Sequence, residues 1–339
     1  MKILVVKLTS MGDVLHLMPA LSDLKKQFPD LSVDWMVEDS FAQIPAWHPS
    51  VSKVIPVATR RWRKLKWANI KEFLSFWKQL RSERYDAVID AQGLIKSAVF
   101  SRFARVARGG KRIGFSGDSI KESPAAKFYR QTVDVDRKMH AIDRLRALFS
   151  GGFEYQIPSN KPDYALASYS VSSRDLPTIF LLHGTTWATK HLPDLFWRKL
   201  AELIAEDGYK VLLCWGNETE RLRAEWIADG QNHVEVLPKS SLTDLKEMMA
   251  KATGAVAVDT GLGHLAAALE LPCVSIYGST DAQLTGALGE NQTWIQSKYP
   301  CSPCLLKTCP KLTEQVTEPP CYQEIKPADI WQSLYEKIA

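Results

Sequence analysis

Apolar residues along the first half of the chain follow two alternating patterns. Runs of strand length, beginning with Ile3 to Val6, are each followed by a polar turn and then by apolar residues at helical spacing, as at Val14, Leu15 and Met18. The same alternation predicts strands over 33–37 and 85–90, a short strand within 51–57, and another short strand that runs into a loop within 109–115. It predicts helices over about 69–82, from after the turn at 91–94 to about 105, and over 140–149, and a loop over 59–67. Strands that alternate with helices of this length predict an α/β fold with a parallel sheet.

The pattern is interrupted once and then restarts. Between Gly151 and Pro177 the chain is rich in glycine, proline and serine, which is typical of a connection between domains. Beyond it we predict strands over 178–182, 210–215, 234–237, 254–258 and 272–277, and helices over 193–206, 220–229, 241–251 and 265–269. The sequence therefore predicts two doubly wound α/β domains, 1–160 and 161–339, and the C-terminal helix could pack back on the first.

Charge divides the chain in the same way. Residues 1–150 contain 27 Lys and Arg against 15 Asp and Glu, whereas residues 151–339 contain 16 against 23. In the basic half Trp62, Trp67 and Trp77 stand among lysines and arginines, a composition that suits phosphate-bearing lipid or nucleic acid. For a charge run by itself, a solvated helix face is the simpler interpretation.

Other features of the sequence narrow the partners. No RNP-like aromatic pattern or zinc-finger spacing is present, so nucleic acid is not expected. No apolar stretch of about 18 residues could span a bilayer, and the chain starts without the pattern of a signal peptide. We expect a cytosolic or peripheral protein that works as a monomer.

Four of the six cysteines follow one another closely in the sequence. Their spacing is compatible with a structural zinc site, although it is not a standard pair of knuckles and no histidine lies among them. Free or redox-sensitive thiols on a proline-rich loop are the favoured interpretation, so no cofactor is expected. The four are Cys301, Cys304, Cys309 and Cys321.

Asp13 follows the first predicted strand, where the chain turns through Thr9, Ser10 and Gly12 into a helix. In open α/β sheets ligands bind beyond the carboxyl ends of the strands, so a carboxylate here could take a proton from a substrate. Asp is also one of the commonest helix N-caps. The sequence leaves both interpretations of Asp13 open.

Loops of the second block carry groups that suit a sugar diphosphate. Asp259, Thr260 and Gly261 open a helix, which supplies free backbone N–H groups for phosphate and a carboxylate for sugar hydroxyls. Further candidates are the hydroxyls of Thr185 and Thr186, the cation of Lys190, the carboxylate of Glu218 for a ribose diol, and His264 as a phosphate donor. A histidine at a helix start is as often structural.

Two common nucleotide-binding motifs are absent. The first turn offers only Gly12 where a dinucleotide site needs Gly-x-Gly-x-x-Gly, and no Gly-x-x-x-x-Gly-Lys-Ser/Thr occurs. An Asp-x-Asp handle for a metal is present only as Asp134 to Asp136, in an ordinary polar stretch. We therefore predict a diphosphate site built from Lys190 and helix termini, with no required metal.

Taken as a set, these motifs resemble those of the bacterial lipopolysaccharide heptosyltransferases of glycosyltransferase family 9, and the resemblance covers nearly the whole chain. The arginine-rich segment at 60–64 and the Asp-Ala-Gln-Gly run favour the first-acting member over its relatives. The matching segments are 10–16, 41–45, 54–57, 60–64, 85–93, 183–186 with Lys190, 236–239 and 258–264. The cysteine-rich loop at 301–321 looks more like other members of the wider family.

The resemblance implies a GT-B fold, in which two Rossmann-like domains face each other across a cleft. It implies inverting transfer of L-glycero-D-manno-heptose from ADP-heptose to a Kdo hydroxyl of Kdo2-lipid A, at the cytoplasmic face of the inner membrane, with peripheral contact to anionic lipid. Asp13 matches the catalytic base. The diphosphate would be held by Lys190, Thr185, Thr186, Thr260 and Gly261, the heptose by Asp259, the ribose by Glu218, and the acceptor's carboxylates and phosphates by Arg60, Arg61, Arg63, Lys64 and Arg144.

Three alternatives stay open at this point. One is a later-acting heptosyltransferase of the same family, of the second type, which needs a heptose already installed on the acceptor. Another is a non-catalytic lipopolysaccharide-assembly protein, which an intact set of Asp13, Lys190 and Asp259 disfavours. The third is a nucleotide-sugar epimerase or a Rossmann-type oxidoreductase, and the missing glycine fingerprint counts against the oxidoreductase.

Overall fold

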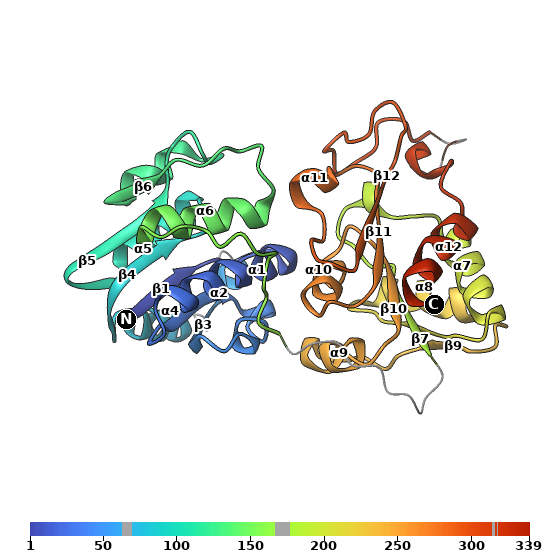
Figure 1. Cartoon of the computed structure of the whole chain (residues 1–339), viewed down its shortest axis with the longest axis horizontal. Helices are drawn as coiled ribbons and strands as arrows, with labels where there is room; N and C mark the ends of the chain where they lie inside the picture. Colours follow the sequence, from blue (N-terminus) through green and yellow to red (C-terminus); the bar gives the residue numbers. More distant parts are fainter. Residues whose placement is uncertain (63–69, 167–176, 314–315, 317) are drawn as a thin grey trace. The chain divides into compact units, whose positions relative to one another are not determined.

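The computed structural model describes residues 1–62, 70–166, 177–313, 316 and 318–339 (Figure 1). The chain divides into two compact units, Met1–Leu166 and Ala167–Ala339, where the sequence predicted domains that meet at residue 160. Two of the predicted acceptor contacts, Arg63 and Lys64, lie outside the described residues, as does Trp67.

The first unit contains a six-stranded parallel sheet of order β3-β2-β1-β4-β5-β6. The strands on the two sides of β1 are reached by chain crossovers in opposite directions, so the switch point of the topology lies between β1 and β4. The strands are β1 Lys2–Val6, β2 Ser32–Glu38, β3 Val51–Val57, β4 Arg84–Asp90, β5 Arg105–Phe115 and β6 Gln131–Val133. The helices are α1 Met11–Leu15, α2 Met18–Gln27, α3 Thr59–Trp62, α4 Ile70–Leu80, α5 Ile95–Phe103 and α6 Ala141–Phe153.

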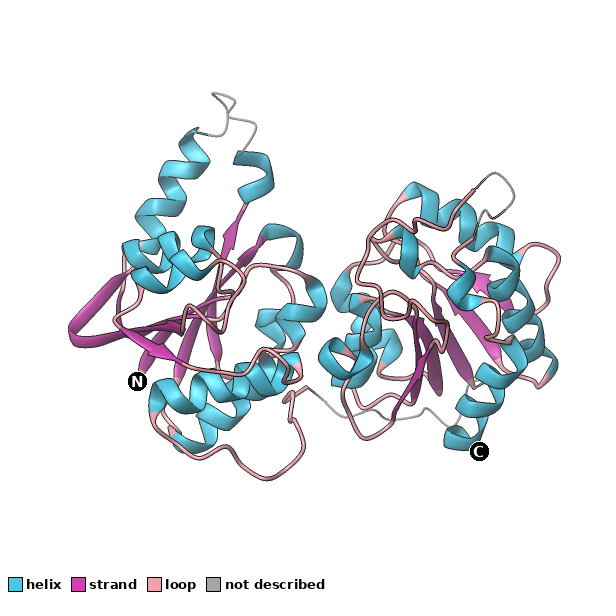
Figure 2. Cartoon of the chain, turned by 90° about the horizontal axis from the view of Figure 1, so that it is seen from above, coloured by secondary structure: helices cyan, strands magenta, loops and turns pink. Residues whose placement is uncertain are grey.

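The second unit repeats this plan with a parallel sheet of order β12-β11-β10-β7-β8-β9, and its switch point lies between β7 and β10. Figure 2 shows helices on both faces of the sheet in each unit. The strands are β7 Thr178–Leu182, β8 Lys210–Leu213, β9 Val234–Val236, β10 Gly254–Val258, β11 Cys273–Tyr277 and β12 Gln292–Gln296. The helices are α7 Asp194–Glu206, α8 Glu218–Ala228, α9 Leu242–Met249, α10 Gly261–Ala268, α11 Ala282–Thr285 and α12 Pro327–Ile338.

The α/β class with two doubly wound domains, predicted from the sequence, is confirmed. Within the described parts of the chain, no helix combines the length and the apolar content that a membrane crossing requires.

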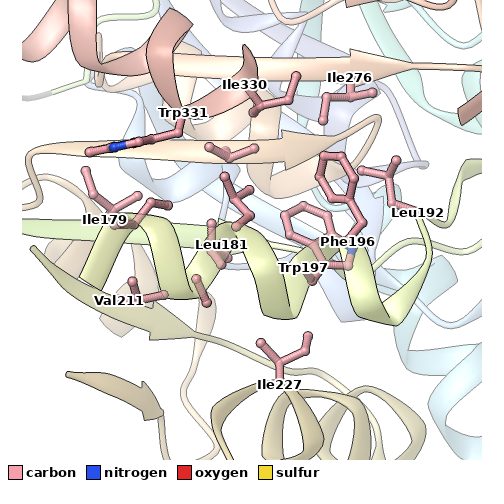
Figure 3. Packing of buried hydrophobic residues seen from close by; sticks show 14 of the residues in the cluster. Ile179, Leu181, Leu192, Phe196, Trp197, Val211, Ile227, Ile276, Ile330 and Trp331 are labelled. Atoms are coloured by element: carbon pink, nitrogen blue, oxygen red, sulfur yellow. The ribbon is translucent and has the colours of Figure 1, made fainter. Parts of the chain in front are cut away.

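The C-terminal helix α12 contributes to the core of the second unit. Its residues Ile330, Trp331 and Leu334 are buried in one cluster with the apolar side chains of β7 and α7, and Figure 3 shows Trp331 and Ile330 in this cluster. The helix packs against α7, β10 and β11. The buried face of α12 is therefore part of the core of its own unit, and additional packing of this helix on the first domain stays a prediction.

Two local predictions in the first unit were wrong. The segment that begins at Thr59 was expected to be a loop, but Thr59–Trp62 forms the helix α3. Its first residues are anchored by Glu38 at the end of β2, which accepts bonds from Thr59 Oγ1 at 2.7 Å and from the Arg60 N–H at 3.3 Å. The spacing of Val14, Leu15 and Met18 predicts one helix, whereas the structure has two, α1 and α2, which divide just before Pro19, a residue without an N–H to continue the helical hydrogen bonds.

A buried ion pair fastens α2 to α6. Arg146 Nε donates to Asp23 Oδ2 at 2.6 Å, and both side chains are almost completely buried. We expect Asp23→Ala to lower the free energy of unfolding of the first unit by about 3–5 kcal/mol, because it leaves the Arg146 cation buried without its counter-ion. Chemical denaturation measures this. Asp30→Ala, at an exposed position nearby, should change the same quantity by less than about 0.5 kcal/mol, and equal effects of the two would contradict the assignment.

Candidate active-site residues in each unit

Asp13 lies in the first turn of α1, directly after the loop that leaves β1 at the switch point of the first sheet. Its Oδ2 accepts hydrogen bonds from the N–H of Ser10 at 2.7 Å and from Ser10 Oγ at 2.9 Å. Its Oδ1 faces Lys7 Nζ at 3.6 Å. The side chain is 43% exposed, so a carboxylate fixed by a helix cap still presents an open surface to a ligand.

The loop that carries Asp13 is held by the neighbouring loop after β4. Gln92 Oε1 accepts from the N–H groups of Leu8 and Thr9, at 2.9 and 3.2 Å. Asp90, completely buried, in turn accepts from the N–H groups of Gln92 and Gly93 and from Tyr129 Oη at 2.7 Å. Burial raises the pKa of the Asp90 carboxyl against these hydrogen bonds. The Asp-Ala-Gln-Gly run thus has a structural function here, because it fixes the backbone beneath Asp13.

The predicted acceptor arginines have different surroundings. Arg60 is exposed on α3, and Arg61 is ion-paired with Asp39 at 2.8 Å and with Glu72. The hydrogen bonds that Arg61 donates to the Glu72 carboxylate raise the pKa of the Arg61 guanidinium further above its usual value. Of the two described arginines of this segment, Arg61 is held by two carboxylates, so Arg60 is the more available for an acceptor.

Arg144 lies on α6, one turn after His140, whose ring contacts that of His16 at the end of α1 with centroids 5.9 Å apart. This contact places the start of α6 beside the helix of Asp13. The Arg144 guanidinium stacks 5.3 Å from the centre of the Phe115 ring and Nη2 donates to the Ser119 carbonyl at 2.5 Å. Burial lowers the pKa of Arg144 from its usual value, and the nearby Arg137 lowers it further.

Asp259 is the centre of a cluster at the carboxyl edge of the second sheet. Its Oδ2 accepts from Lys190 Nζ at 2.7 Å and from Thr280 Oγ1 at 2.6 Å, while its Oδ1 lies 3.9 Å from His264 Nε2. These four residues come from the loops after β7, β10 and β11 and from α10, so parallel neighbours in the sheet bring them together. Thr280 was not among the predicted site residues, because nothing in its local sequence sets it apart.

The electrostatics of this cluster favour the ionised carboxylate. Burial alone would raise the pKa of the Asp259 carboxyl, but the His264 ring and the Lys190 ammonium outweigh burial and hold that pKa well below its usual range. Lys190 Nζ also lies 4.6 Å from the centre of the Trp187 ring, which favours a cation at this place. A cation and a carboxylate are thus held side by side, with the carboxylate buried and the ammonium group slightly more exposed.

Groups that suit phosphate surround the Asp259 cluster. Thr185 Oγ1 donates to the Asp259 carbonyl at 3.0 Å, which joins the β7 loop to the start of α10. Thr260 is the N-cap of α10, and the helix begins at Gly261, where the first backbone N–H groups have no partner within the helix. An ideal Cβ on Gly263 would come within 3.2 Å of Ala257 Cβ, so glycine permits this helix end to lie close against β10. Thr186 lies in the same loop as Thr185.

The two acidic residues at the start of α8 point to different places. Glu218, the predicted ribose contact, is largely exposed and is hydrogen-bonded to Arg221 of its own helix, a bond that lowers the pKa of its carboxyl. Glu220 instead reaches back over the strand ends: its Oε2 accepts from the Gly216 N–H at 2.8 Å, and its carboxyl group would be 2.9 Å from a Cβ on Gly184. Glu220 was not among the predicted site residues, although Asn217 and Glu220 have the spacing of a capping box.

The cysteine-rich loop brings its thiols near one another. Cys301 is exposed and the other three are partly buried, and all are free. Burial, followed by the charges of the three neighbouring thiols, raises the pKa of Cys321 to about 11. Over the described ranges, no three His, Cys, Asp or Glu side chains converge in a way that could hold a metal ion. In the Asp-x-Asp run at 134–136, the carboxylate of Asp134 binds groups of the protein itself, since its Oδ1 accepts from the hydroxyls of Ser116 and Ser119.

Comparison with known proteins agrees with the predicted resemblance. Residues 73–314 match the family model of glycosyltransferase family 9 (heptosyltransferase). The chain is 46% identical over 324 residues to lipopolysaccharide heptosyltransferase 1 of Pseudomonas aeruginosa, an alignment that covers 94% of this chain and 89% of the relative.

Solved structures agree with the sequence relatives. The Escherichia coli heptosyltransferase WaaC with ADP has a TM-score of 0.87 at 38% identity and covers 99% of this chain and 100% of its own. The same enzyme with ADP-2-deoxy-2-fluoro heptose has a TM-score of 0.80 at 41% identity, over 88% and 93%. With the family model, these similarities mean that this chain belongs to glycosyltransferase family 9, the heptosyltransferases.

Proposed function

We propose that this enzyme transfers L-glycero-D-manno-heptose from ADP-heptose to a Kdo hydroxyl of Kdo2-lipid A, with inversion at the anomeric carbon. The observation that carries the proposal is the Asp259 cluster, where a carboxylate, an ammonium group and a helix N-terminus are assembled at one sheet edge. The similarity to a heptosyltransferase solved with ADP and with an ADP-heptose analogue supports it.

On the donor side, each group has a distinct task. The amides at the start of α10, the hydroxyls of the β7 loop and Lys190 neutralise the diphosphate, whose charge grows as it departs. Asp259 accepts hydrogen bonds from heptose hydroxyls, and His264 donates to phosphate. These groups already stabilise a leaving diphosphate, so we propose that transfer needs no metal ion.

On the acceptor side, Asp13 removes the proton of the attacking Kdo hydroxyl. That oxygen approaches the anomeric carbon from the face opposite ADP, and a single displacement inverts the configuration. The arginines Arg60, Arg61 and Arg144, together with Arg63 and Lys64, hold the carboxylates and phosphates of the acceptor. Exclusion of water from the bound donor would protect the activated sugar from hydrolysis.

Location follows from the acceptor. We propose that the enzyme works as a monomer at the cytoplasmic face of the inner membrane, bound peripherally to anionic lipid through its basic first unit. An exposed Lys or Arg near such a surface contributes about 1 kcal/mol, so a few of them give reversible binding.

An acceptor panel tests the proposal. Purified enzyme and ADP-heptose are incubated without acceptor, with Kdo2-lipid A, and with Kdo2-lipid A that already carries one heptose, and ADP release is followed. Release that requires the unmodified Kdo acceptor supports the proposal. Release only with the heptosylated acceptor would assign the later step instead, and no release with either would leave a lipopolysaccharide-assembly protein as the alternative.

The ribose contact can be tested with the paired acids of α8. Glu220 faces the turns at the strand ends, so we propose it, in place of Glu218, as the acceptor for the ribose hydroxyls. Glu220→Gln should then weaken ADP binding about 10-fold, because the charge-assisted hydrogen bond to the ribose is lost. Glu218→Gln, which changes the other acidic residue at the start of the same helix, should change the dissociation constant for ADP less than about twofold. Isothermal titration with ADP makes the comparison, and the reverse order would return the ribose to Glu218.

A further inference from the structure

Helix α4 leaves apolar side chains uncovered on one face. Leu74 is 60% exposed, Phe73 39% and Ile70 37%, while only Phe76 and Leu80 of this helix are buried. The exposed residues recur at helical spacing, so they form one continuous stripe. Exposed apolar side chains that gather on one face usually mark an interaction site, whereas single ones do not.

The stripe is anchored by a chain of aromatic rings. Trp77 contacts Phe73 on its own helix with centroids 5.8 Å apart, and Phe103 at the end of α5 at 5.2 Å. Phe103 is itself 49% exposed, so the uncovered apolar surface extends from α4 to α5. Phe76 connects the same rings to the buried core of the first unit. The exposed side chains therefore stand on a rigid support.

Cations border this surface. Leu74 lies between Lys71 and Lys78, three residues before it and four after it on the same helix face. The acidic neighbours are already neutralised, since Glu72 pairs with Arg61 and Glu83 with Lys2. Four cations make no ion pair with any residue in the described part of the chain: Lys71, Lys78, Arg81 and Arg102.

We propose that the face formed by Ile70, Phe73, Leu74 and Phe103 is the docking surface for an anionic lipid bilayer. The apolar stripe enters the region between headgroups and acyl chains while the bordering lysines and arginines meet lipid phosphates. The four cations beside the apolar stripe favour an anionic bilayer as the partner, because a neutral or basic partner would leave their charges without counter-ions. The inference rests on the proposed membrane acceptor and names the surface through which the enzyme reaches it.

Vesicle sedimentation tests the surface without any saccharide acceptor. Phosphatidylcholine vesicles, with and without phosphatidylglycerol, are mixed with the parent protein and with Leu74→Ser/Lys78→Gln. The parent is expected to sediment with the anionic vesicles and not with the neutral ones. The variant should lose roughly tenfold in partitioning, because it removes one inserted side chain and one phosphate contact.

The second unit offers a matched control. Leu195 on α7 is also 60% exposed, and the exposed Lys199 follows it four residues later, as Lys78 follows Leu74. Leu195→Ser/Lys199→Gln should sediment like the parent. Equal losses in the two variants, or no binding of the parent to anionic vesicles, would overturn the proposal.

Two further readouts separate this inference from its alternatives. Turnover on a deacylated, soluble acceptor should be the same in both variants and the parent, so a failed acceptor assignment leaves the vesicle result intact. Sedimentation velocity reports whether the face is covered by a second copy of the chain. A parent dimer that Leu74→Ser/Lys78→Gln converts to monomer, with vesicle binding unchanged, would overturn the bilayer as occupant.

Discussion

Asp13→Asn should lower the rate of heptosyl transfer by about 10²–10⁴-fold and leave ADP binding and folding unchanged. The amide oxygen of Asn can still accept the bonds that Ser10 now gives to Oδ2 at 2.7 and 2.9 Å, so the start of α1 keeps its cap. What the amide cannot do is take up a proton from the acceptor hydroxyl. Single-turnover ADP release measures the chemistry, and thermal unfolding with and without ADP measures the rest.

Ser10→Ala is the complementary change. It removes the hydroxyl donor but retains the backbone N–H, so the first unit should lose about 1 kcal/mol of stability while turnover stays within a few-fold of the parent. If Asp13 acts only as a cap, the ranking of activities is reversed: Asp13→Asn, which keeps the cap, remains as active as the parent, and Ser10→Ala, which weakens the cap, is the less active of the two. That ranking would require the base to be sought elsewhere.

Most of the fold and the positions of the candidate site could be predicted because both depend on short-range signals. Strand, glycine turn and helix follow one another within about 15 residues, as they do from Lys2 to Leu15. Parallel strands then place every such turn at the same edge of a sheet, which is why Lys190, Asp259 and His264 meet although they are far apart in the sequence.

What could not be predicted depends on partners distant along the chain. The helix at Thr59 is anchored by Glu38, which accepts hydrogen bonds from its first residues, and the loop that carries Asp13 is fixed by Gln92 from the loop after β4. Arg144 and Arg146 look equivalent in the sequence, yet Arg146 forms a buried ion pair with Asp23, whereas Arg144 donates to the Ser119 carbonyl and stacks on Phe115. Glu218 and Glu220 differ only by their rotation about α8, which local composition does not report.

Asp259→Asn should separate binding of the nucleotide from use of the sugar. In the parent, the Asp259 carboxylate holds Lys190 at 2.7 Å and places a negative charge beside the expected diphosphate site. Removal of that charge frees the ammonium and lowers the repulsion, so ADP alone should bind about tenfold more tightly. Transfer from ADP-heptose should nevertheless fall about 10- to 100-fold, because the charge-assisted hydrogen bonds to the heptose hydroxyls are lost.

The pH dependence of the difference in ADP affinity between Asp259→Asn and the parent follows from the surroundings of Asp259. Lys190 and His264 hold the pKa of the Asp259 carboxyl well below its usual range despite burial, so the group is ionised in the parent from about pH 5 upward. A carboxyl whose pKa is depressed by folding loses its contribution only as the pH falls below its unfolded value of about 4. Titration of Asp259 itself should therefore add no pH dependence to the ratio of ADP affinities between variant and parent between about pH 5 and 8 in isothermal titration.

Thr280→Val is the control for the Asp259 comparison. It removes a hydroxyl donor to the same Oδ2, at 2.6 Å, but retains the negative charge, so it should not tighten ADP binding. If Asp259→Asn weakened ADP binding as much as it slowed transfer, the carboxylate would act by positioning Lys190 for the diphosphate. The heptose hydroxyls would then have to be bound by another group. Direct contact between Asp259 and the heptose instead requires that transfer from ADP-heptose is lost while ADP binding is not.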